Sequence, residues 1–179
     1  MALILRSSIR PAVIAIGAIV ALFLSLAPAA SAADPTFSRS NFATGNSPIS
    51  IAAGDLNGDL RPDLVTANDQ DNNVTVLFAD AFGGFTGPLA LATGAQPRDV
   101  AIADFNGDGN PDLAVANGNQ VSIMLGDGLG GFATAVGYAT PGEVPVGIVA
   151  GDFNQDGRRD VALANVFTGL SVMLGDGAG

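Results

Sequence analysis

Four residue types are missing from this sequence, which contains no cysteine, no histidine, no lysine and no tryptophan. Without histidine and cysteine, a Ser-His-Asp triad, a thiol nucleophile and the usual zinc sites are excluded. Without lysine there is no Schiff base and no phosphate-binding P-loop lysine. The missing cysteines also mean that disulfides do not hold the fold together.

The charged residues are unusual as well, because 16 of the 17 acidic residues are Asp and Glu143 is the single Glu. The seven basic residues are all Arg, and the formal net charge is −10. Helical surfaces normally use Glu and Lys, so their near absence argues against helices, whereas Asp is common in turns. An acidic surface repels phosphate backbones, so nucleic acid is not an expected partner.

The N-terminal 33 residues have the organisation of a secretory signal peptide. Arg6 and Arg10 precede an apolar run over residues 12–26, and small residues follow up to Ala33. A retained membrane anchor is the alternative, since the 23 uncharged residues 11–33 could just span a bilayer. The small residues at the exit favour cleavage near Ala32 or Ala33. We therefore expect a secreted or cell-surface protein whose mature part is residues 34–179.

Three nine-residue stretches stand out in the mature part, at residues 55–63, 104–112 and 152–160. Each has Asp or Asn at its first, third, fifth and ninth positions. Alternate side chains of a tight loop can point at one centre, and calcium takes six to eight oxygen ligands. Gly occupies the fourth position in two copies and the sixth in two, which eases the turn. The pattern predicts a calcium-binding loop that occurs three times in the chain.

The loops repeat at intervals of 49 and 48 residues, and short strand-like runs flank each of them. Such runs, at residues 63–68 and 73–78 for example, are rich in β-branched residues and bounded by Gly, Asn and Asp. Four strands in about 48 residues, repeated along the chain, describe a propeller blade. The predicted fold is therefore all-β, a partial β-propeller of about three four-stranded antiparallel blades.

The repeated motifs resemble FG-GAP/VCBS repeats, the blades of integrin-α-like propellers. The resemblance rests on Gly-Asp-Phe-Asn-(Gly/Gln)-Asp-Gly…Asp-(Leu/Val), on Gly-Gly-Phe and on Val-Ser-(Ile/Val)-Met-Leu-Gly-Asp-Gly, and it spans residues 37–179. It implies a calcium ion in the loop between the first two strands of each blade. It also implies an extracellular adhesion or ligand-binding role, although the family includes lectins and proteins of unknown role.

Each loop is expected to bind calcium through four side chains and through the backbone carbonyl of its seventh residue. The predicted ligands are Asp55, Asn57, Asp59, Arg61 and Asp63, then Asp104, Asn106, Asp108, Asn110 and Asp112, and finally Asp152, Asn154, Asp156, Arg158 and Asp160. The competing interpretation is an Asp- and Asn-rich hairpin turn without metal. An EF-hand is excluded because its loop needs a carboxylate near position twelve, where this chain has Thr66, Val115 and Leu163.

The first loop has Leu60 at the sixth position, where the others have Gly. We expect a positive φ there, which costs a branched side chain roughly 1 kcal/mol or more. The first site is therefore expected to be the weakest.

Other recurring residues are predicted to be structural. The recurring Phe residues are interpreted as blade packing, and Asn68, Asn117 and Asn165 as turn residues. Glu143 is expected to be a solvated loop acid, because no second carboxylate stands at a non-repeated position to pair with it.

The predicted domains are the signal peptide (1–33) and the repeats (34–179), comprising an outer strand (34–46) and repeats at 47–94, 95–142 and 143–179. Residues 37–44 align with the fourth strand of a unit, and the third repeat stops within a motif. Since closed propellers usually have four to eight blades, we expect the N-terminal piece of a longer protein.

The predicted function is a secreted, calcium-binding and non-enzymatic module for adhesion or for recognition of an extracellular protein or glycan. After signal cleavage no membrane association is expected, and no residue is assigned a catalytic role. Two alternatives remain open: a structural repeat protein of the cell surface without a specific ligand, and a propeller domain of a larger secreted enzyme.

Overall fold

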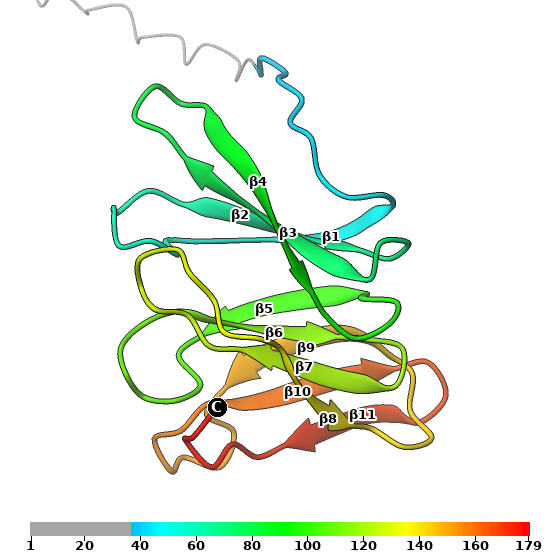
Figure 1. Ribbon diagram of the computed structural model, residues 1–179. Coiled ribbons are helices and arrows are strands. Elements are labelled where there is room, and N and C mark those ends of the chain that lie inside the picture. Colours follow the sequence, from blue (N-terminus) through cyan, green and yellow to red (C-terminus); the bar gives the residue numbers. More distant parts are fainter. Residues whose placement is uncertain (1–36) are drawn as a thin grey trace, which may run out of the picture. The chain divides into compact units, whose positions relative to one another are not determined.

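A computed structural model describes residues 37–179, and in these residues all regular secondary structure is β-strand. The predicted signal peptide lies outside the described residues. Eleven strands form three antiparallel sheets within the compact unit Ser40–Gly179 (Figure 1). No segment of residues 37–179 forms a helix that could cross a membrane. The all-β prediction is therefore confirmed.

The three sheets follow the chain order, and we call them blades 1 to 3. Blade 1 consists of β1 (Pro48–Gly54), β2 (Asp63–Asn68), β3 (Asn73–Ala79) and β4 (Phe85–Ala92). Blade 2 consists of β5 (Asp99–Ala103), β6 (Asp112–Ala116), β7 (Gln120–Met124) and β8 (Val136–Ala139). Blade 3 consists of β9 (Pro145–Gly151), β10 (Asp160–Asn165) and β11 (Gly169–Met173). In every blade, neighbouring strands are also consecutive in the sequence.

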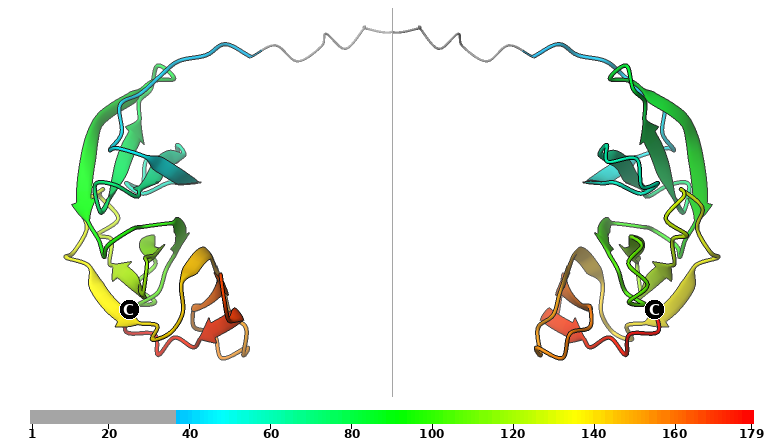
Figure 2. Two further views of the ribbon diagram at one scale, coloured as in Figure 1. Left: turned by 90° about the vertical axis from the view of Figure 1, so that its right-hand side faces the viewer. Right: turned by 90° about the vertical axis from the view of Figure 1, so that its left-hand side faces the viewer.

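Blade 2 is packed on both faces, which explains why its central strand β6 is apolar throughout. Leu113 and Val115 belong to the hydrophobic cluster shared with blade 1. Ala114 and Ala116 belong to the cluster shared with blade 3. Because successive side chains of a strand point to opposite faces of the sheet, one strand contributes to two cores. Figure 2 shows blade 2 between its two neighbours.

The first strands of the blades, β1, β5 and β9, contact one another in turn, and Asp99 of β5 connects all three. Its Oδ1 accepts a hydrogen bond from the Ser50 hydroxyl of β1. Its Oδ2 accepts the Ile148 N–H of β9 at 2.9 Å. A single carboxylate therefore joins three blades.

Blade 3 differs from the other two, because its sheet ends at β11 and has no fourth strand among the described residues. Residues 37–47, part of which was expected to form an outer strand, are not in a strand. A fourth strand forms only against a third strand, and blade 1 already pairs its own β3 with β4.

Tight turns join the third and fourth strands of blades 1 and 2, and an Asp closes each of them. Asp127 Oδ1 accepts hydrogen bonds from the N–H groups of Leu129 and Gly131, both at 2.8 Å. These bonds, that from Leu129 first, lower the pKa of Asp127 below its ordinary value of 3.8. Asp80 accepts the N–H groups of Phe82 and Gly84 in the same way.

We expect Asp127→Asn to reduce stability at neutral pH and to have a smaller effect in acid. A carboxylate whose pKa is lowered by folding stabilises the protein above its unfolded pKa, and this contribution is lost as the pH falls through the folded pKa. The urea midpoints of wild type and variant should therefore begin to converge as the pH falls below about 5 and should go on converging below 3.8, the ordinary pKa of this carboxyl. Leu129→Ala, which leaves the carboxylate and the N–H in place, is the control. A difference that stays constant with pH would contradict this role of Asp127.

Candidate metal centres

The three Asp-rich loops connect the first and second strands of each blade, and they share one backbone conformation. In all three, the fourth and sixth residues have positive φ angles. These angles are 77° and 64° at Gly58 and Leu60, 77° and 87° at Gly107 and Gly109, and 63° and 86° at Gln155 and Gly157. Two residues with side chains therefore adopt the left-handed conformation that costs an L-residue about 1–2 kcal/mol. The expected positive φ at Leu60 is confirmed, whereas the sequence analysis missed Gln155.

The first Asp of each loop accepts hydrogen bonds from the backbone N–H groups of the tight turn. Asp55 Oδ1 accepts the N–H of Gly58 at 2.8 Å and of Asp59 at 3.1 Å, and its Oδ2 accepts the N–H of Leu60 at 2.8 Å. Desolvation raises the pKa of Asp55 and is the largest single influence, but the N–H groups of Leu60, Gly58 and others together lower it. Asp104 and Asp152 accept equivalent bonds in their own loops.

The third and fifth residues extend this network towards the seventh. In each loop the third-position Asn accepts the N–H of the fifth residue, at distances of 3.0 to 3.1 Å. The fifth-position Asp accepts the N–H of the seventh residue, at 2.7 to 2.9 Å. The Asn110 N–H and the Asn106 side chain lower the pKa of Asp108. The Asn154 side chain and the Arg158 N–H do the same for Asp156.

The first loop departs from this pattern at its seventh residue. Arg61 Nη2 lies 2.7 Å from Asp59 Oδ2 and forms an ion pair with it. In the second and third loops, the corresponding carboxylate oxygen accepts the side-chain amide of Asn106 or Asn154. A guanidinium on the carboxylate competes with any other cation. The first loop therefore has two features that weaken a metal site, Leu60 and Arg61.

The ninth Asp of each loop is fully buried, at 0% exposure in Asp63, Asp112 and Asp160. In the second loop, Asp112 Oδ2 accepts the Phe105 N–H at 2.8 Å and Oδ1 accepts the Gly126 N–H at 2.7 Å. Asp63 and Asp160 likewise accept the N–H of the second residue of their loops. Asp63 also accepts the N–H of Ala79, the last residue of β3, and Asp160 accepts that of Gly175 just after β11. Desolvation raises the pKa of Asp112, and the N–H groups of Gly126 and Phe105 partly offset this rise. The ninth Asp thus fastens the loop to the blade.

The sequence analysis assigned this residue only as a calcium ligand and missed its hydrogen bonds. The recurring Leu-Gly-Asp-Gly after the third strand was the available signal, because Gly126 and Gly175 in that motif donate to Asp112 and Asp160. A carboxylate oxygen can accept more than one interaction, so the bonds do not use all of its capacity.

The donor chemistry of the loops fits a hard cation, because the side-chain donors at positions one, three and five offer oxygen. These three residues of each loop lie together within one hydrogen-bonded turn. Residues 37–179 contain no group of three or more acidic side chains arranged closely enough to hold a metal ion together. In the described geometry the carboxylates are directed at backbone N–H groups, and the ninth Asp is held apart in the blade.

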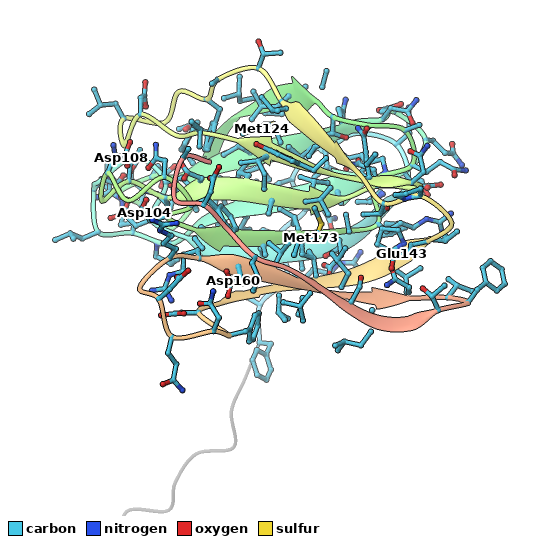
Figure 3. The ribbon with its side chains drawn as sticks, turned by 90° about the horizontal axis from the view of Figure 1, so that it is seen from below. Asp104, Asp108, Met124, Glu143, Asp160 and Met173 are labelled. Carbon is cyan, nitrogen blue, oxygen red and sulfur yellow. The ribbon has the colours of Figure 1, made fainter. Side chains whose placement is uncertain are left out.

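Glu143 and the recurring Asn residues lie at the other end of the blades from the Asp-rich loops, as Glu143 and Asp104 show in Figure 3. Glu143 Oε2 accepts the Ser171 hydroxyl at 3.1 Å, and Ser171 in turn accepts the Asn165 amide at 2.9 Å. The side-chain amide of the buried Asn117 donates to the backbone carbonyl of Val115 and to the hydroxyl of Ser122. These residues order the strand ends.

We expect Leu60→Gly to stabilise the protein by about 0.5–1 kcal/mol. Leu60 is 91% exposed, so the change removes little packing. The change relieves the strain of the left-handed conformation, about 1–2 kcal/mol. Part of this gain is lost because Gly makes the unfolded chain more flexible and so raises the entropic cost of folding. Leu60→Ala is the control, because it keeps the Cβ atom that causes the strain. Equal urea midpoints for the Gly and Ala variants would contradict the strain at this position.

The blades and loops of this chain match those of a known repeat family. The model of the FG-GAP-like repeat matches residues 55–115 and again residues 104–163. The two matches together cover more than half of the sequence, and each runs from one Asp-rich loop into the next blade. The chain belongs to the FG-GAP-like repeat family.

Solved structures with similar regions are much longer than this chain. They include the Tc holotoxin pore of Photorhabdus luminescens (23% identity, TM-score 0.48, 68% of this chain and 6% of that one). They also include TcdB2-TccC3 (25%, 0.44, 64% and 6%) and the V. cholerae biofilm matrix protein Bap1 (24%, 0.41, 65% and 18%). The chain therefore spans less than a fifth of the length of each. No curated protein sequence matches.

Proposed function

We propose that this chain is a calcium-stabilised, non-enzymatic recognition module of an exported protein. The observation that supports it most is the common conformation of the three loops, retained although Leu60 and Gln155 are strained in it. Strain that recurs at one position of a repeat indicates that the conformation itself is required. An oxygen-rich loop of this kind suits calcium.

Calcium would supply positive charge to loops that hold nine of the 16 Asp residues. Asp, Asn and Asp at the first, third and fifth positions would hold it, and the buried ninth Asp would keep the loop on the blade. Any ion that binds the folded chain and not the unfolded one stabilises folding by mass action. The role of calcium is therefore structural in this proposal.

A recognition role fits a rigid blade scaffold that carries loops at both ends. Catalysis is not favoured, because the acids of residues 37–179 lie mainly at repeated, structural positions and Glu143 bonds Ser171 of its own blade. The ligand class we propose is an extracellular protein or a glycan. Export rests on the predicted signal peptide, residues 1–33.

The recognition role is tested by probing glycan and extracellular-protein arrays with the purified chain, in calcium and in chelator. We expect one ligand class to be retained in calcium and lost in chelator. The variant Asp104→Ala with Asp108→Ala should lose binding in calcium, whereas the exposed Asp176→Ala should keep it. No retained ligand on either array in calcium would contradict a recognition role.

A further inference from the structure

The connection between blades 2 and 3 contains a group of polar side chains, two of which are deeply buried. Thr140 and Asn165 are 4% and 8% exposed, so each is more than nine-tenths buried. Among residues 37–179, Thr140 Oγ1 and Asn165 Oδ1 have no hydrogen-bond partner. Buried polar atoms are nearly always paired, and a bound ion is one explanation for an atom that is not.

The equivalent atoms between blades 1 and 2 are paired with each other. Thr93 and Thr140 each follow the fourth strand of their blade, and their N–H groups donate to the residue just before the third strand. The Thr93 hydroxyl donates to Oδ1 of Asn117, the repeat equivalent of Asn165, at 3.1 Å. The Asn117 amide group donates only to residues of its own blade. The partners of this Asn therefore come from its own blade and from the preceding connection, and not from a following blade.

The connection after Thr140 differs from its counterpart because it contains a tight turn. The Glu143 N–H donates to the Thr140 carbonyl at 3.1 Å, and Gly142 has a φ of 79°. Pro141 at the second position and a Gly of positive φ at the third are typical of a type II turn. The turn places Glu143 beside blade 3, where its side chain reaches β11.

Glu143 replaces a hydrogen-bond donor with a carboxylate. Between blades 1 and 2, the Gly94 N–H donates to the Ser122 hydroxyl oxygen at 3.3 Å. Between blades 2 and 3, the equivalent hydroxyl, that of Ser171, donates to Glu143 Oε2 at 3.1 Å. Ser171 also accepts the Asn165 amide at 2.9 Å, so it links the carboxylate to this buried Asn. The group therefore carries a negative charge at a place where the previous connection is neutral.

The oxygens of this group suit a small cation. An amide oxygen and a carboxylate can only accept, and a hydroxyl can accept as well as donate. Hard cations prefer such oxygen ligands. Glu143 carries the only formal charge among these side chains, and a partly buried site is least costly when its charges balance. One carboxylate balances a monovalent cation, whereas each Asp-rich loop has three carboxylates. The group therefore fits sodium better than calcium.

We propose that Thr140, Glu143 and Asn165 bind one sodium ion at the connection between blades 2 and 3. Its protein ligands are Oγ1 of Thr140, Oδ1 of Asn165 and the carboxylate of Glu143. The ion holds the connection against blade 3. Glu143 lies at the opposite end of the blades from Asp104 (Figure 3), so this site is separate from the candidate calcium loops. The inference is independent of calcium and of the extracellular ligand.

The test compares urea unfolding of the purified chain in sodium chloride and in choline chloride, both with a sodium-free chelator. Equal ionic strength keeps the screening of surface charges the same. An ion that binds only the folded chain raises the folding constant by one plus the ratio of its concentration to its Kd. We expect a rise of at least about threefold in about 0.3 M sodium. Glu143→Gln and Thr140→Val should both lose this dependence on sodium.

Thr93→Val is the matched control, because it removes the equivalent hydroxyl from the connection in which that hydroxyl is paired. It should lower the urea midpoint by the same amount in both salts and keep the dependence on sodium. The sodium NMR signal reports the ion directly, and wild type should broaden it more than Glu143→Gln does. A site filled by water alone predicts the same sodium dependence and the same broadening for wild type and Glu143→Gln. Either of these results would overturn the proposal.

Discussion

Replacement of Asp112 by Ala is expected to lower the free energy of unfolding by about 3–5 kcal/mol. Asp112 is 0% exposed, and its two oxygens accept the N–H groups of Phe105 and Gly126 at 2.8 and 2.7 Å. Hydrogen bonds to a charged group contribute more than neutral ones, and each buried N–H that loses its partner carries a desolvation penalty. Such a loss is a large part of the 5–15 kcal/mol that stabilises a typical domain.

Asp127→Ala provides the matched comparison, because Asp127 also accepts two backbone N–H groups at 2.8 Å but does so on the surface. Water can replace the lost acceptor there, so we expect a much smaller loss than for Asp112→Ala. Urea unfolding of both variants in excess chelator separates the effect from calcium binding. Similar losses for Asp112→Ala and Asp127→Ala would show that burial of the ninth Asp does not matter.

Calcium removal is the second change with a large expected effect. An ion at 100 times its dissociation constant stabilises a site by about 2.7 kcal/mol, so three sites give about 8 kcal/mol. For a domain of this size, about 1 kcal/mol changes the melting temperature by about 3 °C. We therefore expect the melting temperature to fall by about 25 °C when calcium is replaced by chelator.

Magnesium is the control for this melting experiment. It demands near-octahedral geometry and gives up its water reluctantly, so it should restore only a small part of the lost melting temperature. Asp104→Ala combined with Asp108→Ala should remove about a third of the calcium-dependent shift, because it disables one loop of three. Equal melting temperatures in calcium and in chelator would contradict structural calcium sites.

The fold was predictable from the sequence because the repeat places strong local signals in fixed order. The β-branched runs at residues 63–68 and 73–78 became β2 and β3. The expected outer strand did not form at residues 37–44, because pairing depends on a partner edge that the local sequence does not specify. The family resemblance was confirmed by the FG-GAP-like repeat match.

The loops were less predictable, because one residue type can serve two purposes. The nonapeptide pattern places Asp63, Asp112 and Asp160 among the ligands, but it does not show that burial directs their oxygens to backbone N–H groups. The Arg61–Asp59 ion pair was also missed, because the residue at position seven was considered only for its backbone carbonyl and not for its side chain. Which oxygens face a cation remains a prediction.

Titration of calcium into the chelator-stripped chain, followed by isothermal calorimetry, tests the calcium sites most directly. We predict three bound ions per chain, with the first loop the weakest of the three sites because of Leu60 and Arg61. Asp104→Asn with Asp108→Asn should reduce the number to two and leave the other sites unchanged. A chain that folds in chelator and takes up no calcium would contradict the account.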